Sequence, residues 1–278
     1  MIEGLCGGGL DGAAHGGLGA GMKAIILAGG LGSRLSEETV VRPKPMVEVG
    51  GLPILWHIMK TYSHYGVHDF VICLGYKGHL IKEYFANFFL YSADVTFDIG
   101  NNRVEYHQNH SEPWRVTLIE TGNETLTGGR LKRALPYVAG EEAFCFTYGD
   151  GVTDVDISAL IGFHRRQKTL VTLTAVQPAG KYGVLDIEGD KVGSFAEKPG
   201  TGGGWVNGGY FVLSPKVGEY IEGDQTSWET GPLVRLAAEG QVSAYQHRGF
   251  WQSMDTIHER NLLEEYWKSG HAPWKVWE

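Results

Sequence analysis

KAIILAGGLGSR, residues 23–34, is a short run of apolar residues that leads directly into a glycine-rich turn. A continuous apolar run of this length is typical of a strand buried on both faces, as in a parallel sheet. The turn, Leu27–Arg34, offers successive backbone amides with few side chains in the way, and such a loop can wrap around phosphates. Taken alone, the segment fits a tight strand-to-helix connection equally well. It lacks the third glycine of the dinucleotide fingerprint and the Gly-Lys-Ser/Thr of a Walker A loop, so neither of those sites is predicted.

Strands and helices continue to alternate along the chain. Buried strands are predicted at residues 69–74, 143–148 and 170–175, and amphipathic helices at residues 54–65, 79–90 and 157–167. Strands separated by helices pair in parallel, because the helical crossover returns the chain to the same edge of the sheet. We therefore predict an α/β fold with a doubly wound, mostly parallel, Rossmann-like sheet that carries helices on both faces.

Shorter segments add small antiparallel β structure to this core. Residues 95–99, 103–107 and 114–120 alternate polar and apolar side chains and indicate an antiparallel insertion or a sheet edge. Beyond residue 180 we expect a hairpin with its turn at Glu188–Asp190, and then a strand in NGGYFVLSP. Helical spacing at residues 257–267 predicts a closing helix.

The first 21 residues differ from the rest of the chain. They contain nine glycines and almost no periodic apolar pattern. Such a segment cannot bury enough apolar surface to offset the entropy lost on ordering, so we predict that residues 1–21 are disordered. They also lack the basic start and apolar core of a secretory signal. Residues 22–278 are expected to form a single domain.

Composition excludes several classes of function. The chain of 278 residues is 42% hydrophobic and 20% charged and has a formal net charge of -8. We expect no membrane partner, because no apolar run approaches the length of a membrane span. The acidic balance argues against a nucleic-acid partner, so any phosphate substrate must be met by local lysines and arginines. Cys6, Cys73 and Cys145 form no CxxC pair, and the histidines show no zinc-binding spacing.

A lysine on a stiff segment follows the glycine-rich turn. In RPKPMVEVGGLPIL, residues 42–55, Lys44 lies between two prolines. Each proline fixes its own backbone angle and restricts the residue before it. A lysine held in this way can be directed at a ligand.

LAGGLGSRL followed by RPKPMVEVGGLPIL resembles the signature of the sugar-1-phosphate nucleotidylyltransferases. The resemblance runs from Met22 to Glu278. The motifs TGGRLKR, FTYGDG, EKP, NGGYFVL and GFWQSMDT also occur in the order seen in the subgroup that uses CTP and glucose 1-phosphate. Ser33 stands where many relatives have threonine and keeps the hydroxyl. The resemblance implies a nucleotidyltransferase-type core and transfer of a cytidylyl group from CTP to glucose 1-phosphate, with release of pyrophosphate and with Mg²⁺ as the cofactor.

Two aspartates are the candidate metal ligands. Asp150, in YGDG, follows a predicted strand at the point where open α/β sheets present ligand-binding groups, although a turn aspartate that bonds its own backbone would look the same. The resemblance makes it a Mg²⁺ ligand and adds Asp255, in QSMDT, as the second. Asp255 would alternatively suit the N-cap of the following helix, with help from Thr256.

By the same resemblance, Arg34, Lys44 and Lys198 are the candidate catalytic residues. Lys44 would neutralise charge on the triphosphate, and Lys198, in AEKPG, would hold the phosphate of the sugar. Lysine suits both tasks as a compact point charge, although a lysine outside such a motif is usually solvated surface. Glu197 and Asn207 would contact the sugar hydroxyls.

The nucleotide would be held by the glycine-rich turn and by two later segments. The candidate residues are Leu27, Ala28, Gly29, Gly30, Leu31, Gly32, Ser33, Thr127, Arg130, Tyr148 and Gly149. Arg130, in TGGRLKR, is the candidate for contact with the base and the triphosphate. A helix N-terminus that carries exposed basic residues is the alternative for the same segment.

Two other functions fit these residues. A relative that uses UTP or dTTP with the same sugar would differ at only a few loop contacts. A silent, ligand-sensing paralogue would be expected to lose a metal carboxylate or a lysine, but Lys44, Asp150, Lys198 and Asp255 are all present. The resemblance further implies a cytoplasmic homo-oligomer, such as a hexamer, that makes deoxysugar precursors for a cell-surface polysaccharide such as O-antigen.

Overall fold

The computed structural model describes residues 19, 21–30, 35–107, 112–178, 184–188, 191–196 and 204–278. Of residues 1–21, which were predicted to be disordered, all but Gly19 and Gly21 lie outside this description, as do the turn residues 189–190.

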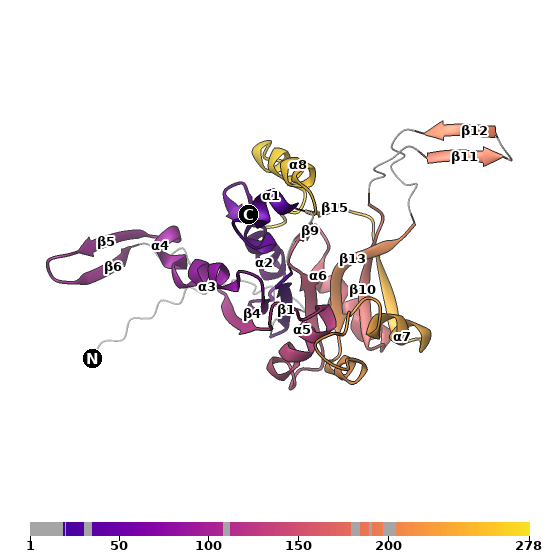
Figure 1. The fold of residues 1–278 in the computed structure, drawn as a ribbon, viewed down its shortest axis with the longest axis horizontal. Coiled ribbons are helices and arrows are strands. Elements are labelled where there is room, and N and C mark those ends of the chain that lie inside the picture. Colours follow the sequence, from indigo (N-terminus) through magenta and orange to yellow (C-terminus); the bar gives the residue numbers. More distant parts are fainter. Residues whose placement is uncertain are drawn as a thin grey trace, which may run out of the picture.

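A seven-stranded sheet forms the centre of the molecule (Figure 1). Its strand order is β14-β10-β13-β8-β1-β4-β7. The strands are β1 (Lys23–Ala28), β4 (Asp69–Leu74), β7 (Arg115–Glu120), β8 (Phe144–Tyr148), β10 (Val171–Val176), β13 (Val206–Leu213) and β14 (Val242–His247). Within this sheet, β13 pairs antiparallel with both of its neighbours, and every other pair is parallel. The predicted mostly parallel sheet is confirmed.

Helices cover both faces of the sheet. They are α1 (Ser36–Thr39), α2 (Ile54–His64), α5 (Thr127–Ala134), α6 (Ile157–Gln167), α7 (Pro232–Ala238) and α8 (Ile257–Lys268), with 3-10 turns η2 (Lys44–Met46), η3 (Leu135–Tyr137) and η4 (Pro215–Tyr220). Residues of α2, α6 and α8 belong to one buried cluster, and residues of α5, η4 and α7 belong to the other. The fold is therefore doubly wound, as predicted.

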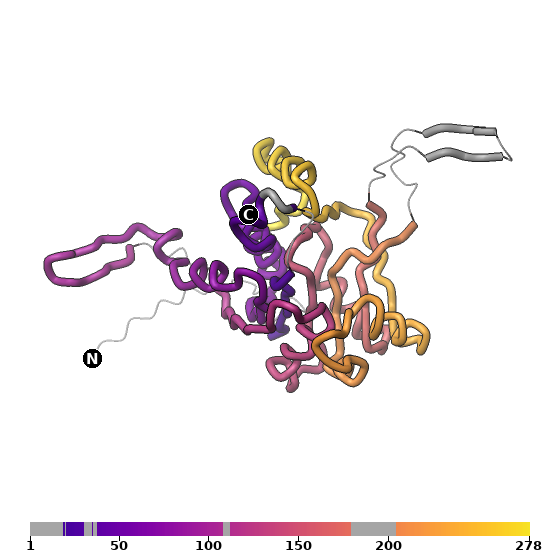
Figure 2. The backbone as a smooth tube through the Cα atoms, viewed as in Figure 1, coloured from indigo at the N-terminus to yellow at the C-terminus, as the bar shows by residue number. Residues whose placement is uncertain are grey.

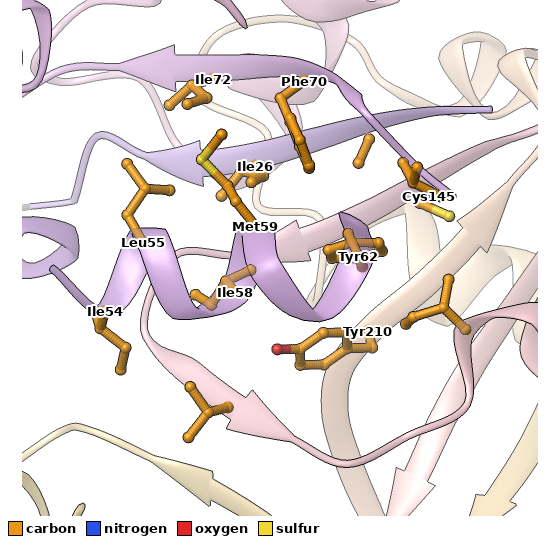
Figure 3. Close-up of a cluster of buried hydrophobic side chains, with 14 of the residues drawn as sticks. Ile26, Ile54, Leu55, Ile58, Met59, Tyr62, Phe70, Ile72, Cys145 and Tyr210 are labelled. Carbon is orange, nitrogen blue, oxygen red and sulfur yellow. The ribbon is translucent and has the colours of Figure 1, made fainter. Parts of the chain in front are cut away.

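The sequence of β1 explains the two cores. Successive side chains of a strand point to opposite faces, and β1 is apolar on both. Ala24 and Ile26 join the cluster beneath α2, while Ile25 and Leu27 join the cluster on the other face. Figure 3 shows Ile58, Met59 and Tyr62 of α2 turned toward the first of these faces. Burial on both sides fixes the strand, and with it the turn that follows.

One predicted helix is divided in two. Residues 79–90 form α3 (Gly78–Ala86) and α4 (Phe88–Ser92), which are separated at Asn87. The Asn87 side-chain amide and its backbone N–H both donate to the carbonyl oxygen of Glu83, at 2.9 and 3.0 Å. Asparagine competes in this way for helix backbone groups, and it ends α3 although the apolar spacing continues.

The predicted antiparallel additions are present, and of the two alternatives predicted for residues 114–120 the sheet edge is confirmed. Short antiparallel pairs join β2 (Glu48–Val49) to β3 (Leu52–Pro53), β5 (Asp94–Asp98) to β6 (Arg103–His107), β9 (Gly151–Thr153) to β15 (Trp251–Ser253), and β11 (Val184–Glu188) to β12 (Lys191–Ala196). The segment predicted at residues 114–120 is the edge strand β7, but it pairs parallel with β4. An edge strand alternates because one side is partly exposed, and this pattern does not encode its direction.

The β5–β6 hairpin projects from the body of the molecule (Figure 2). It carries exposed apolar side chains, including Phe97 and Ile99. None of the helices in the described part of the chain is long and apolar enough to cross a membrane.

Candidate active site

The site lies where β1 and β8 end. These two strands are parallel neighbours in which Leu27 is paired with Tyr148. The glycine-rich turn after β1 and the Gly149–Asp150 turn after β8 therefore leave the same edge of the sheet side by side. In open α/β sheets, ligands bind beyond the carboxyl ends of the strands at such an edge.

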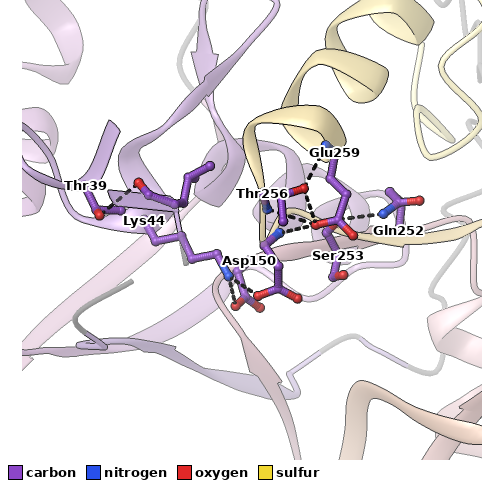
Figure 4. A network of polar contacts seen from close by, with 9 residues as sticks. Thr39, Lys44, Asp150, Gln252, Ser253, Thr256 and Glu259 are labelled. Atoms are coloured by element: carbon purple, nitrogen blue, oxygen red, sulfur yellow. Dashed lines mark hydrogen bonds and ion pairs between the residues drawn. The ribbon is translucent and has the colours of Figure 1, made fainter. Parts of the chain in front are cut away.

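Lys44 reaches this edge from η2. Pro43 precedes the turn with φ -66° and ψ 150°, and the backbone N–H of Met46 donates to the Pro43 carbonyl. The Lys44 Nζ lies 2.7 Å from Asp150 Oδ2 and 2.7 Å from Asp255 Oδ1. Figure 4 shows Lys44 and Asp150 pointing toward each other. The stiff segment predicted from the prolines does aim its lysine at the two candidate metal ligands.

A two-stranded ribbon brings the two aspartates together. Asp150 immediately precedes β9, and Asp255 follows β15, its antiparallel partner. Beyond the ribbon, the backbone N–H of Met254 donates to the Asp150 carbonyl at 2.8 Å. The N-cap of α8 is Thr256, which forms a capping box with Glu259. Thr256 thus fills the capping role that was the alternative for Asp255, and the Asp255 carboxylate faces Lys44.

The Lys44 ammonium marks a position for a cation between two carboxylates. Its side chain is 11% exposed, against 35% for Asp150 and 27% for Asp255. Burial opposes the charged form of Lys44, but the two carboxylates outweigh it, and the pKa of Lys44 is raised. In the described residues, no group of three or more His, Cys, Asp and Glu side chains could hold a metal ion. Mg²⁺ bound here would take its other ligands from phosphate oxygens and water, which is its usual mode of binding.

A cavity of about 470 Å³ lies beside this pair. It is lined by Leu27, Ala28, Gly29, Gly30, Lys44, Pro45, Asn123, Glu124, Thr125, Leu126, Thr127, Arg130, Tyr148, Gly149, Asp150 and Asp255. All the nucleotide-site candidates within the described residues are among them. Leu31, Gly32, Ser33 and Arg34 lie outside the described residues.

Residues 123–126 were missed by the sequence reasoning. They belong to the connection from β7 to α5, and Thr125 is buried there. The sequence did contain a signal, because this connection leaves the carboxyl end of a predicted strand just before TGGRLKR.

A smaller cavity of about 230 Å³ adjoins the first and shares Tyr148, Asp150 and Asp255 with it. Asn207 and Gly208, at the start of β13, and Trp251 form part of its wall. Asn207 therefore lies near the carboxylates, as its predicted sugar contact requires. Glu197 and Lys198 lie outside the described residues.

Arg130 is buried beneath the larger cavity. Its guanidinium donates to the carbonyls of Gly29, Leu74 and Asn123 at 3.0, 3.1 and 3.2 Å, and to the Thr121 hydroxyl at 2.7 Å. Burial lowers its pKa, and no ion pair within the described residues joins it to a carboxylate. The exposed helix terminus considered as an alternative is therefore wrong for Arg130, although α5 does begin at Thr127.

The Arg130 contacts explain one glycine. A Cβ on Gly29 would lie 2.1 Å from Nη1 of Arg130, so the arginine can bind the turn only because residue 29 has no side chain. Arg130 thus connects the glycine-rich turn to the ends of β4 and β7 and leaves a positive charge under the cavity.

The comparisons with known proteins agree with this geometry. The model of the nucleotidyl transferase family matches residues 23–267. The chain therefore belongs to the nucleotidyl transferase family.

Individual relatives give a more specific comparison than the family model. The chain is 58% identical over 257 residues to the glucose-1-phosphate cytidylyltransferase of Salmonella typhi, which covers 92% of this chain and all of the relative. It is 43% identical over 259 residues to the probable glucose-1-phosphate cytidylyltransferase of Bacillus subtilis, again across 92% of this chain and all of that protein. Among solved structures, HddC from Yersinia pseudotuberculosis superposes with a TM-score of 0.62 at 25% identity, covering 88% of this chain and 99% of HddC.

Proposed function

We propose that the protein transfers a cytidylyl group from CTP to glucose 1-phosphate, giving CDP-glucose and pyrophosphate. The observation that carries this proposal is the position of Lys44 between Asp150 and Asp255, in the wall of a cavity that Gly29 and Gly30 also line. The 58% identity to a glucose-1-phosphate cytidylyltransferase supports the choice of both substrates.

The reaction is an in-line displacement at phosphorus. A phosphate oxygen of glucose 1-phosphate attacks the α-phosphorus of CTP, a new P–O bond forms, and the bond to pyrophosphate breaks. The nucleophile is already an anion, so the site has to position two mutually repelling phosphates and neutralise charge on the leaving group.

The described residues suit these tasks. The carboxylates of Asp150 and Asp255 would hold Mg²⁺, which when bound supplies charge neutralisation for phosphate oxygens. Lys44 adds a second positive charge next to the carboxylates, and Gly29 and Gly30 line the larger cavity. Asn207 lines the smaller cavity, where it would contact the sugar together with Glu197 and Lys198.

Pyrophosphate release tests the proposal. The protein is assayed with glucose 1-phosphate, Mg²⁺ and each of CTP, UTP, dTTP, ATP and GTP in turn, and strong selectivity for CTP is expected. Release with UTP or dTTP instead would agree with the proposed reaction type but contradict the proposed choice of CTP as the nucleotide. Release with none would favour a silent, ligand-sensing paralogue.

We also propose that the protein is a cytoplasmic homo-oligomer, such as a hexamer, that supplies deoxysugar precursors for a cell-surface polysaccharide. The exposed apolar side chains of α4 and the β5–β6 hairpin support the oligomer, since Tyr91 is 74% exposed and Ile99 is 85% exposed.

A further inference from the structure

Three hydroxyl groups converge on Glu229, a residue outside every motif considered so far. The Tyr148 phenol donates to Glu229 Oε1 at 2.6 Å. The hydroxyls of Thr127 and Ser227 donate to Oε2 at 2.6 and 3.0 Å. A carboxylate can only accept hydrogen bonds, so the protons of all three hydroxyls point toward Glu229.

On the sugar side, the tyrosine that donates to Glu229 shares a cavity wall with Asn207. The Asn207 side chain accepts from the Gly209 N–H through Oδ1 at 2.9 Å. Asn207 and Tyr148 both line the smaller cavity. Burial and then the Glu229 carboxylate raise the pKa of Tyr148, while a side-chain hydrogen bond from Asn207 opposes the rise. The Tyr148 phenol is therefore a hydroxyl that donates to Glu229 and lines the smaller cavity with Asn207.

A close approach keeps this geometry in place. Gly209 has φ 77°, a conformation that favours glycine, and a Cβ there would lie 2.7 Å from Cδ2 of Tyr148. The Tyr148 ring thus packs directly on the start of β13, beside Asn207.

On the nucleotide side, the same carboxylate fixes the start of α5. Thr127, the first residue of α5, accepts from the Trp228 N–H at 2.9 Å while it donates to Glu229. Thr127 lines the larger cavity and Asn207 lines the smaller one. Tyr148 lines both cavities, so hydroxyl groups in the walls of both donate to Glu229.

We propose that Glu229 is a positioning residue that couples the sugar side of the site to the nucleotide side. It holds Tyr148 as a donor, and Tyr148 forms the wall of the smaller cavity together with Asn207, where the hexose would bind. This inference rests on the proposed function, because it takes Asn207 as a sugar contact.

The test uses Glu229→Gln and Tyr148→Phe, singly and together. A glutamine offers one acceptor oxygen and one donor group, so it cannot accept from both Tyr148 and Thr127. We expect Glu229→Gln to lower kcat/KM for glucose 1-phosphate about tenfold, chiefly through KM, with little change in Tm. Because both changes break one chain of hydrogen bonds, the double variant should lose no more than about twofold beyond the weaker single variant.

Glu239→Gln is the matched control. Glu239 accepts from the Tyr220 phenol at 2.6 Å in an exposed Tyr–Glu pair away from both cavities, so its variant should keep the parent kinetics. Glu229→Gln kinetics within twofold of the parent, or losses that multiply in the double variant, would overturn the proposal. If Glu229→Gln does not fold, Tyr148→Phe and Thr127→Val replace it. Both residues act through Glu229. If the fold losses in kcat/KM of the two single variants multiply in the double variant, the proposal is contradicted; if the double variant loses little more than a single variant, it is supported.

Failure of the proposed function would be recognised separately. If the parent protein turned over no nucleotide, binding of glucose 1-phosphate would be measured by calorimetry on the parent and on Glu229→Gln. Binding weakened about tenfold in the variant would support the role of Glu229. Equal affinities, or no binding by the parent protein, would overturn it.

Discussion

At the scale of single residues, the proposed mechanism depends directly on the charge of Lys44. We expect Lys44→Met to lower kcat by about 10²–10³, the loss typical of removing one electrostatic contact to a transition state. The variant also leaves Asp150 and Asp255 without the ammonium 2.7 Å from each. Mg²⁺ should therefore raise the Tm of Lys44→Met more than that of the parent protein, as measured by scanning fluorimetry.

Lys23→Met is the control for this experiment. Lys23 pairs with Glu141 at 3.0 Å at the start of β1, the opposite edge of the sheet from the site. Its variant should show the parent response to Mg²⁺. Equal Mg²⁺ shifts in all three proteins would contradict the cation position inferred from Lys44.

Lys198 should act on one substrate only. We expect Lys198→Ala to raise KM for glucose 1-phosphate strongly and to leave CTP binding largely intact, because this lysine would contact the sugar phosphate. Steady-state kinetics with each substrate varied in turn gives both values. A similar loss for CTP would count against the assigned role.

His57 makes stability depend on pH. Its Nε2–H donates to the Val49 carbonyl at 2.9 Å, and its Nδ1 accepts from the Trp274 indole N–H at 3.3 Å, so the neutral ring is fully bonded. Burial lowers the pKa of His57 to about 4. In the unfolded chain the pKa of His57 is about 6.5. As pH falls below that value, His57 binds a proton in the unfolded chain but stays neutral in the folded protein. Stability is therefore complete above that pH and is lost as pH falls toward 4.

The expected loss from His57 is on the order of 2 kcal/mol between pH 6.5 and pH 5. Urea unfolding at several pH values measures it. Comparison with His57→Gln separates the contribution of His57 from that of the carboxylates. The free energy of unfolding of the variant should fall less between these pH values, by that amount. Identical pH dependence in the two proteins would show that His57 binds a proton as readily in the folded protein as in the unfolded chain.

At the scale of elements, the start of α5 is packed against backbone. A Cβ on Gly129 would lie 2.5 Å from the Asp224 carbonyl oxygen. Alanine favours helices, yet we expect Gly129→Ala to destabilise the protein by about 1–3 kcal/mol because backbone yields little. Gly140→Ala, where a Cβ meets nothing within 4 Å, should stay within about 0.5 kcal/mol of the parent in urea unfolding. A neutral Gly129→Ala would show that the contact can relax.

The elements most easily predicted are those whose own sequence decides them. Strand β4 and helix α6 were predicted to the residue, because continuous apolar residues suit a doubly buried strand and helical spacing suits a covered helix. The break at Asn87 and the direction of β7 depend on one side chain and on pairing, which periodicity does not report.

The site was predictable where a motif marks a strand end and unpredictable where contacts join distant segments. Asp150 and the glycine-rich turn follow strands, and the structure brings both to one cavity. The meeting of Asp150 with Asp255 depends on a ribbon of only three residues per strand. Burial of Arg130 depends on contacts with the ends of β1, β4 and β7, and the hydroxyls around Glu229 depend on packing between α5 and residues 224–229. No local pattern encodes either set of contacts.

At the scale of the whole molecule, the exposed apolar surface on α4 and the β5–β6 hairpin should hold the oligomer together. We expect the parent protein to exceed the monomer mass in light scattering, and Tyr91→Asp with Ile99→Asp to return it to a monomer with an unchanged Tm. These side chains are 74% and 85% exposed, so the substitutions cost the monomer little. A monomeric parent protein would contradict the proposed oligomer. An unchanged molecular mass in the double variant would show that the interface lies elsewhere.

The reversed direction of β13 affects which parts of the proposed site can change in evolution without disturbing the sheet. Because β13 is antiparallel to β8 and β10, it begins at the edge of the sheet where those strands end. The chain therefore leaves β10 at Val176 and returns at Val206 on the same rim. A connection anchored in this way can be lengthened, shortened or replaced without moving any strand register. The proposed sugar contacts Glu197, Lys198 and Asn207 would then be free to change within one segment, whereas the cavity proposed for the nucleotide is fastened to three strand ends by Arg130.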